Sequence, residues 1–397
     1  MLIVKLLFLL LITISAFFYI LYIGNFSLIL LLIMCIFPII TFISLLITKH
    51  SLSASLTVAT KSVLKNEPFD VHLTIKNKSV FPIAKAEATI EYTNCFNNSS
   101  SYLELHFPVT TRNCQSLSFS LTSQFCGTIS IKAVEIKIYD PLRIFKMHIK
   151  KCSDTSIVVL PASYEIFGAV TESASCGDES SIYSQFRPGD DPSEVFNLRE
   201  YIGGDKINRI HWKLSCKKDE FIVKEFSQPV DTSTAIFLST DFSQSQAITL
   251  SIIDTAIEVF TSISQFLTEN ERPHTLINFN CKSDSFDEII IDSQEAMNAA
   301  AYKTVKNYSP THTDNNNPEH FFKSKQYLNY SSFTFITASL NQEIIDTIEN
   351  NISCDIINII FIVKDENHSE SDLSTSNASL IYVPAGRISA FLNEIEL

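Results

Sequence analysis

Glycine is scarce in this chain of 397 residues, at 8, and tryptophan occurs once. So few glycines leave no glycine-rich loop of the kind that cradles nucleotide phosphates. The 9 cysteines are an odd number and contain no Cys-x-x-Cys pair, which argues against a zinc or disulfide framework. The chain has 30 Lys and Arg against 43 Asp and Glu, and the resulting net charge of −13 excludes general affinity for nucleic acids.

Two long apolar runs open the chain, Leu2–Ile23 and Phe26–Ile47, with only two residues between them. Each run spans about 33 Å as a helix, which matches the hydrocarbon thickness of a bilayer. We therefore predict a transmembrane helical hairpin over residues 1–49. A cleaved signal peptide is the alternative, but the first run is too long for its apolar region and a second full-length run follows.

The few charges near these runs predict their orientation. Lys5 lies within the start of the first run, Lys49 and His50 follow the second, and the connecting turn carries no charge. Because basic residues favour the cytoplasmic side, both ends of the hairpin are expected in the cytoplasm. The remainder of the chain is then expected to be cytoplasmic.

Apolar and polar residues alternate over residues 50–150, as in FDVHLTIKN, AEATIEYTN, SLSFSLTSQ and TISIKAVEIKIYD. This period of two predicts strands with one buried face. The strands follow one another with no helical segment, which indicates an antiparallel β-sandwich of the immunoglobulin kind.

Residues 231–397 show a different pattern, in which strands such as TAIFLST, HTLINFN, SFTFITA and IINIIFIV alternate with helical segments. Such alternation predicts an α/β domain with a mostly parallel sheet. The first helix is expected to bury one apolar face, formed by Ile252, Ala256, Val259, Phe260, Ile263 and Leu267.

Residues 151–230 form a connector that is dense in charged and aromatic side chains. From Phe186 to Phe226 there are eight Lys and Arg and eight Asp and Glu, a balance that favours internal ion pairs. Over Asn208–Ser215 apolar and charged residues alternate, which predicts one strand of a hairpin with Trp212 as a core anchor.

Two features of the connector have a chemical and a structural interpretation. His211 could act as a general base oriented by Asp205 or Glu200, but no nucleophile lies in a recognisable motif, so a structural histidine is favoured. Asp190 and Asp191 could bind a cation, yet the surrounding Pro and Gly residues favour a turn.

The stretch FRPGDDPSEVFNLREYIGGDKINRIHWKLSCKKDEFIVKEF, behind an apolar hairpin and a strand-rich region, resembles the bacterial family known as domain of unknown function 58. The resemblance is densest over about forty residues. The matching positions are Arg199, Glu200, Tyr201, Gly204, Asp205, Ile210, His211, Trp212, Lys213, Lys224, Glu225 and Phe226.

This resemblance implies a membrane-anchored protein whose C-terminal domain is similar to a von Willebrand factor type A domain. Proteins of the family are typically encoded beside MoxR-type AAA+ ATPases and transglutaminase-like membrane proteins, and their own activity is undefined. The implied role is the assembly or maturation of partner proteins.

Type A domains often carry a metal site of the form Asp-x-Ser-x-Ser. Here Asp241, Ser243 and Ser245 follow the strand TAIFLS at the expected place, and such oxygen ligands suit Mg²⁺. Ala338 follows Thr337 where a further acidic ligand is expected, so the site is incomplete. The alternative is a polar loop with a serine cap.

The sequence as a whole predicts a membrane-anchored interaction protein that is not an enzyme, and no nucleic-acid partner. Two alternatives stay open: a hydrolase that uses His211 and Asp205, and an adhesion or envelope module outside the cytoplasm.

Overall fold

The structure of the chain is a computed structural model. It describes residues 2–22, 24–96, 100–149, 153–166, 183–189, 195–203, 205–229, 234–239, 250–308, 321–322, 330, 332–352, 354, 356–364 and 374–388. Two compact units form: Met1–Ser123 with Thr128–Val158, and Gln124–Gly127 with Val159–Leu397.

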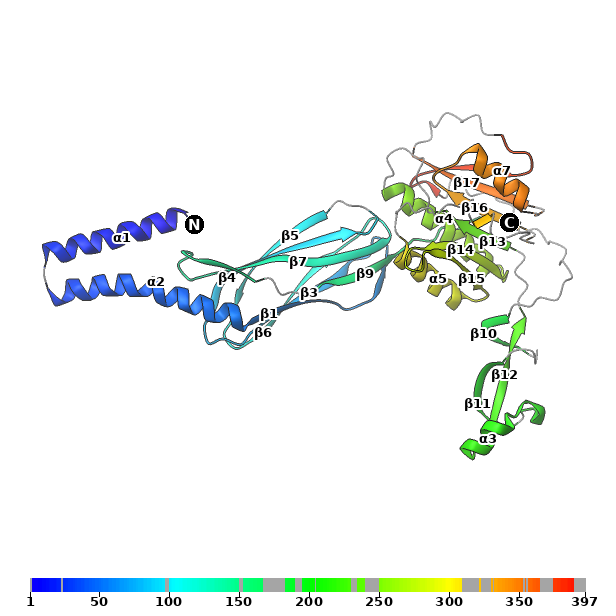
Figure 1. Ribbon diagram of the computed structural model, residues 1–397, viewed down its shortest axis with the longest axis horizontal. Coiled ribbons are helices and arrows are strands. Elements are labelled where there is room, and N and C mark those ends of the chain that lie inside the picture. The colour runs from blue at the N-terminus through cyan, green and yellow to red at the C-terminus, as the bar shows by residue number, and fades with distance from the viewer. Residues whose placement is uncertain are drawn as a thin grey trace. The chain divides into compact units, whose positions relative to one another are not determined.

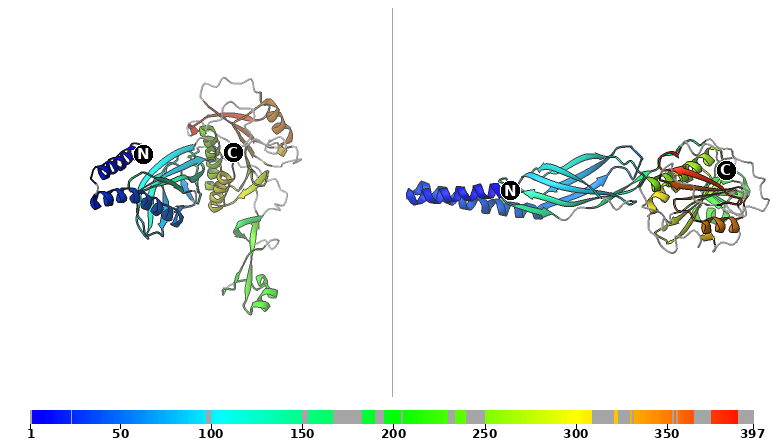
Figure 2. Two further views of the ribbon diagram at one scale, coloured as in Figure 1. Left: turned by 60° about the vertical axis from the view of Figure 1, so that its left-hand side comes forward. Right: turned by 90° about the horizontal axis from the view of Figure 1, so that it is seen from above.

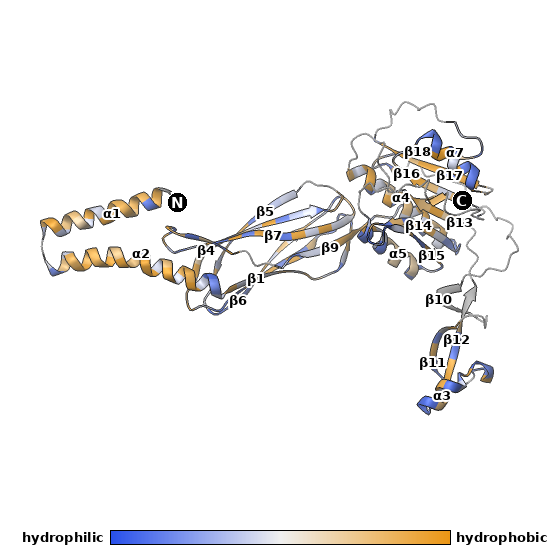
Figure 3. Ribbon diagram, viewed as in Figure 1, coloured by the Kyte–Doolittle hydropathy of each residue, from blue (hydrophilic) through white to orange (hydrophobic). Residues whose placement is uncertain are grey.

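The predicted helix pair is confirmed as α1 (Leu2–Leu21) and α2 (Asn25–Ser51), which run back to back in a hairpin (Figure 1). Both helices are long and apolar enough to cross a membrane (Figure 3). Their apolar side chains are largely exposed. Ser27 tightens the turn, because its hydroxyl donates to the carbonyl oxygen of Gly24 at 2.9 Å. These features are consistent with membrane anchoring.

A third helix of comparable length, α4 (Leu250–Glu269), has the composition of a membrane span but another setting. Of its most apolar stretch, 78% is buried inside the protein, against 6% and 11% for α1 and α2. All six residues of the predicted apolar face are buried. The helix therefore belongs to the core of the C-terminal unit.

The strand-rich region that follows α2 is confirmed as two sheets that enclose an apolar core (Figure 1). One sheet has the order β1-β3-β6 and the other β2-β9-β7-β4-β5, with β8 paired to β7. Strand pairs β1–β3, β3–β6, β4–β5, β4–β7 and β7–β8 are antiparallel. The strands are β1 (Leu52–Val58), β2 (Ser62–Leu64), β3 (Phe69–Asn77), β4 (Ile83–Asn94), β5 (Ser100–Val109), β6 (Cys114–Leu121), β7 (Gly127–Tyr139), β8 (Lys146–Ile149) and β9 (Thr155–Leu160).

Strand β3 shows why the period of two predicts this fold. Phe69, Val71, Leu73 and Ile75 are all buried, and the residues between them are more exposed. Because successive side chains point to opposite faces, one face of the strand joins the core. Strand β9 lies within the stretch assigned to the connector, residues 151–230, but it pairs in the larger sheet of the sandwich.

Helix α2 passes directly into strand β1, because Ser51 ends the helix and Leu52 begins the strand. The turn after β3 holds this junction. The backbone N–H of Lys78 donates to the carbonyl oxygen of Ser51 at 3.1 Å, and the hydroxyls of Thr48 and Ser79 lie 3.3 Å apart. The last turn of α2 is thus fixed to the sandwich.

Asn77 is the hub of this junction and is 1% exposed. Its amide nitrogen donates to the carbonyl oxygens of Phe81 and Thr110 at 3.1 and 3.0 Å. Its side-chain oxygen accepts from the backbone N–H and the hydroxyl of Ser79 at 2.9 and 2.8 Å. One buried amide therefore joins the β3–β4 and β5–β6 turns.

The C-terminal α/β region contains one six-stranded sheet with the order β15-β14-β13-β16-β17-β18. All neighbouring strands are parallel except β14 and β15. The strands are β13 (Thr234–Leu238), β14 (His274–Asn280), β15 (Ser285–Ile291), β16 (Ser332–Thr337), β17 (Ile356–Val363) and β18 (Ser379–Pro384), and the further helices are α5 (Gln294–Asn307) and α7 (Gln342–Asn351).

Phe237 is the centre of the core on one face of this sheet. Its ring centroid lies 5.2 Å from that of Phe321 and 5.3 Å from those of Phe286 and Phe335. Buried residues of α7, among them Ile345, complete the cluster. Among the described residues, the cluster includes none from α4, which contacts β13 and β16 and therefore covers the other face (Figure 2).

A separate small sheet, with the order β10-β12-β11, carries the signature segment of the sequence. Its elements are β10 (Tyr183–Gly189), β11 (Val195–Glu200), the short 3₁₀ helix η1 (Ile207–Arg209), α3 (Trp212–Lys218) and β12 (Ile222–Pro229). We call these elements the signature module.

Replacing Asn77 with alanine is expected to destabilise the protein by about 3 kcal/mol, because the buried N–H and hydroxyl of Ser79 lose their acceptor and two carbonyl oxygens lose a donor. Denaturant unfolding of the full-length protein in detergent measures the change. Asn113→Ala is the matched control: Asn113 is exposed, and its side-chain oxygen accepts from the N–H of Cys114, the next residue. An equal loss in both variants contradicts a hub role for Asn77.

Candidate functional site

The signature module is built around the buried start of β12. Ile222 and Val223 are 5% and 1% exposed, and Ile210 forms a backbone bridge with Val223. The buried hydroxyl of Ser215 accepts from the N–H of Ile222 at 2.9 Å, which attaches α3 to the strand. The segment before β12 is therefore held by backbone and hydroxyl contacts rather than by a large core.

The predicted hairpin strand over Asn208–Ser215 is wrong, because residues 212–218 form the helix α3. His211 begins the helix: its Nδ1 atom accepts from the N–H of Leu214 at 3.3 Å. Asp219 ends it in a left-handed conformation with φ of 59°. The alternating pattern covers only about two turns of helix, so the local caps at both ends decide the structure in favour of a helix.

The prediction that Trp212 anchors a core is also wrong. Its side chain is 55% exposed, and its ring meets that of Phe221 edge-on at 6.3 Å. Phe221 is 59% exposed and has a second edge contact with Tyr201, also at 6.3 Å, which is itself 38% exposed. We call Tyr201, Trp212 and Phe221 the aromatic triad.

Arg199 holds the module together through two carboxylates. Its terminal nitrogens bind both oxygens of Asp205 at 2.7 and 2.8 Å, and its Nε atom donates to Glu225 at 2.6 Å. Three residues of the signature module, from β11, the loop after it and β12, thereby form one ion-pair network. A guanidinium can serve both carboxylates because its donors form a planar fork.

This network changes the acidity of its members. The hydrogen bonds from Arg199, followed by the N–H of Ile202 at 2.9 Å, lower the pKa of Asp205 to about 2. The same carboxylates raise the pKa of Arg199 above its ordinary value. Asp205 is therefore ionised at physiological pH, and it acts as an acceptor rather than a proton donor.

The other signature residues are distributed over the surface and the edges of the module. Glu200 and Lys213 are exposed, and Lys224 is partly buried on β12. Phe226 lies beneath Arg209, whose guanidinium carbon is 5.5 Å from the ring centroid. Gly204, Asp190 and Asp191 lie outside the described residues.

His211 and Asp205 do not form the pair that a hydrolase needs. Asp205 is bound by Arg199 and Ile202, whereas Nδ1 of His211 faces the first turn of α3. Within the part of the chain that the structure describes, no hydrogen bond joins the two side chains. The geometry gives the enzymatic alternative no support.

A Ser–His contact does occur elsewhere, where the sequence offers no motif for it. The hydroxyl of Ser264 lies 2.7 Å from Nε2 of His274, and Nδ1 lies 3.0 Å from the carbonyl oxygen of Arg272. Both side chains are buried, and burial lowers the pKa of His274 to about 4. A neutral imidazole sealed from substrate joins α4 to β14 and is a structural element.

The predicted metal ligands Asp241, Ser243 and Ser245 lie outside the described residues. The neighbouring strand β16 ends at Thr337, whose hydroxyl donates to the carbonyl oxygen of Ser339 at 2.7 Å. Ala338 adds no ligand, and the described residues contain no group of three acidic, His or Cys side chains placed to hold a metal. The described part of this edge therefore adds nothing to the predicted ligand set, and the magnesium site stays a prediction.

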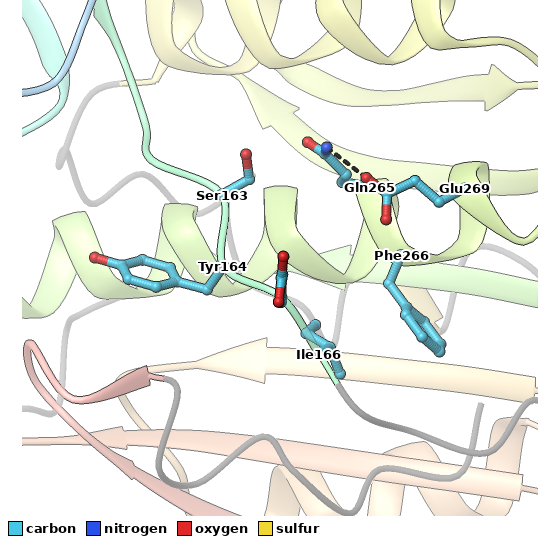
Figure 4. Close-up of a pocket in the computed structure, with 7 residues that line it drawn as sticks. Ser163, Tyr164, Ile166, Gln265, Phe266 and Glu269 are labelled. Atoms are coloured by element: carbon cyan, nitrogen blue, oxygen red, sulfur yellow. Dashed lines mark hydrogen bonds between the residues drawn. The ribbon is translucent and has the colours of Figure 1, made fainter.

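A cavity of about 260 Å³ lies between residues 163–166 and the end of α4 (Figure 4). It is lined by Ser163, Tyr164, Glu165, Ile166, Gln265, Phe266 and Glu269. Gln265 donates to Glu269 at 2.7 Å across its rim. The cavity is small and polar compared with ordinary ligand pockets, and none of these seven residues belongs to the signature.

Comparison with protein-family models gives no match, and comparison with curated proteins gives none. Among solved structures, the CARDB domain of a Pyrococcus furiosus protein has 12% identity and a TM-score of 0.21, covering 27% of this chain and 91% of that one. A cohesin module of a Clostridium perfringens glycoside hydrolase has 14% identity and a TM-score of 0.21, covering 27% and 96%. A β-glucosidase from Erythrobacter marinus has 11% identity and a TM-score of 0.20, covering 28% of this chain and 15% of that one. Scores this low support no conclusion about function.

Acid is expected to destabilise the signature module only as pH approaches the lowered pKa of Asp205. Because the folded pKa is about 2 against an ordinary 3.8, the ion pair stabilises the module above that ordinary value and is lost as pH falls toward 2. Emission of Trp212, the sole tryptophan, reports the change.

In Arg199→Lys, which cannot bind both carboxylates in a planar fork, the emission change is expected at higher pH. Glu200→Gln, a change in the adjacent exposed carboxylate, is the matched control and is expected to follow the native profile. Identical profiles for the native protein and Arg199→Lys contradict this role of the ion pair.

Proposed function

We propose that this chain is a membrane-anchored interaction protein that works with a MoxR-type AAA+ ATPase in the assembly or maturation of partner proteins. The observation that carries the proposal is the exposed aromatic triad on the signature module. The partner is inferred from the resemblance to the domain of unknown function 58 family, whose signature residues form this module. The same resemblance suggests a transglutaminase-like membrane protein in the assembly.

The triad has the properties of a binding surface for protein. Contiguous exposed aromatic side chains are uncommon on soluble domains and are enriched at interfaces, where tryptophan and tyrosine often dominate the binding energy. Ile202 and Ile207, 65% and 67% exposed, extend the apolar surface along the chain. Exposed charges of both signs, among them Lys213, Lys217, Glu200 and Glu220, flank the triad in sequence, so its rim favours neither sign of charge on the partner.

The fixed network beneath the triad supports the same function. Arg199 attaches β11 to β12 and to the Asp205 loop, and the backbone N–H of Tyr201 donates to the carbonyl oxygen of Phe221 at 2.9 Å. Two rings of the triad are thus held in place before a partner arrives. A preorganised surface loses less conformational entropy on binding.

We also propose that the C-terminal α/β region is similar to a von Willebrand factor type A domain and that the sandwich is of the immunoglobulin kind. The mixed six-stranded sheet with helices on both faces supports the first proposal. Two antiparallel sheets around an alternating core support the second. Both proposals describe platforms for binding, consistent with the function proposed.

Trp212→Ala is expected to weaken binding of the purified MoxR-type ATPase by about tenfold or more, because it removes the largest ring of the triad. Titration of the ATPase onto full-length protein in detergent measures it. Tyr102→Ala, at a 62% exposed tyrosine on β5, is the matched control and is expected to bind normally. If both variants bind like the native protein, the triad is not the docking surface.

His211→Asn separates the interaction role from the hydrolase alternative. Asparagine can still cap α3, so partner binding and cellular function are both expected to persist. Binding in detergent and complementation of a deletion strain measure the two properties. Loss of cellular function with binding intact favours an enzyme that uses His211 instead.

Cysteine labelling tests the expected cytoplasmic orientation against the extracytoplasmic alternative. Cys114 in the sandwich and Cys216 in the signature module are both exposed. An impermeant maleimide is expected to leave both unlabelled in intact cells and to label both after permeabilisation, as mass spectrometry of their peptides shows. Labelling in intact cells places these domains outside the cytoplasm.

A further inference from the structure

The end of the sandwich where α2 enters carries an unusual concentration of positive charge. It is formed by the last turn of α2, the β3–β4 turn, the β5–β6 turn and the β7–β8 turn. Six exposed basic residues belong to these segments or to the ends of the strands beside them, and we call them the basic rim: Lys49, Lys76, Lys78, Arg112, Arg143 and Lys146.

Acidic charge is almost absent from the same segments. Over residues 39–53, 76–84, 109–114 and 140–147 the only acidic residue is Asp140, which is 2% exposed. Its carboxylate accepts from the backbone N–H of Phe145 at 2.7 Å and is turned into the protein. The rim is therefore positive within a chain whose net charge is −13.

Hydrogen bonds place these segments together at one end. The N–H of Arg112 donates to the carbonyl oxygen of Ser79 at 3.1 Å, and the N–H of Asn77 donates to that of Asn113 at 2.9 Å. The hydroxyl contact between Ser79 and Thr48 connects both turns to α2. The rim thus surrounds the point at which the apolar helix leaves the sandwich.

The β7–β8 turn extends further along the helix. The ring centroid of Phe145 lies 5.1 Å from that of Phe42, which precedes the end of α2 at Ser51 by about 14 Å of helix. Phe42 also lies inside the apolar run that ends at Ile47. The turn that carries Arg143 therefore reaches the depth at which an apolar helix meets the headgroup layer.

Exposed apolar side chains accompany the charges. Val80 and Phe81, at the tip of the β3–β4 turn, are 61% and 38% exposed, beside the Ser79 that contacts α2. Apolar tips surrounded by lysine and arginine are the composition by which proteins settle into a lipid interface: the apolar groups enter the acyl boundary and the bases meet the phosphates.

We propose that the basic rim, with Val80 and Phe81, is a binding surface for anionic phospholipid headgroups, on which the membrane-proximal end of the sandwich lies. The helix-to-strand junction commits the surface to lipid rather than to a soluble partner, because α2 carries it to the bilayer. This inference stands apart from the proposed partner binding, which uses residues of the other unit.

The test places a tryptophan at the tip in the full-length protein reconstituted into vesicles. In a Trp212→Phe background, which removes the only native tryptophan, Phe81→Trp provides the probe. Brominated phosphatidylcholine is expected to quench its emission and phosphatidylglycerol to shift that emission to the blue. Tyr102→Trp is the control, because Tyr102 lies seven residues up β5 from Val109, at about 3.4 Å per residue.

Equal responses of the two probes overturn the inference, since the tip of the β3–β4 turn then stands clear of the bilayer.

The role of charge has its own pair of variants. The double variant Lys78→Glu, Lys146→Glu is expected to abolish the blue shift that phosphatidylglycerol causes. High salt is expected to abolish it too, because salt shortens the screening length of electrostatic interactions. The double variant Lys61→Glu, Lys132→Glu changes the net charge by the same amount at positions away from the rim, and it is expected to preserve the blue shift. If both pairs behave alike, the surface has no preference for anionic lipid.

Discussion

The continuous passage from α2 into β1 is the constraint on which the N-terminal unit depends. A flexible linker would let the sandwich turn freely on its anchor, but here the backbone goes from helix to strand between Ser51 and Leu52. Asn77 and Ser79 close the junction with buried hydrogen bonds that water cannot replace without cost. The direction of α2 therefore fixes the orientation of the sandwich.

The signature module follows a different principle, because charge holds it where apolar area is small. Ile210, Ile222 and Val223 provide a narrow core, and Arg199 with its two carboxylates supplies the remaining connections. Ion pairs at a partly exposed site contribute little net stability by themselves, but a planar fork fixes geometry. This explains why the large rings of the module can face outward: the fold does not need them inside.

The elements with strong periodicity could be predicted from the sequence. The apolar runs of α1 and α2, the alternation of β3 and the helical face of α4 each repeat over enough residues for one structure to fit best. The alternating pattern misplaces Trp212 because the seven residues of α3 are too few for a period to decide, and the His211 cap is a local contact that alternation does not reveal. The ion-pair network around Arg199 could be anticipated only as charge balance, since Arg199 and Glu225 are 26 residues apart in the sequence.

Helix α4 poses a problem for the synthesis of the chain, because its length and apolar composition match those of a membrane span. In the finished protein it is a core element, but a translocon meets it as an extended segment before the sheet exists to cover it. Asp254 and Glu258 are buried on this helix, and the carboxylate of Asp254 accepts from the N–H of Cys126 at 2.6 Å. A charged side chain near the centre of a span raises the free energy of insertion by roughly 3 kcal/mol. The same carboxylates that are accommodated in the fold thus make α4 a poorer membrane span than α1 or α2, whose mean hydropathies are 2.5 and 2.9 against 1.3 for α4.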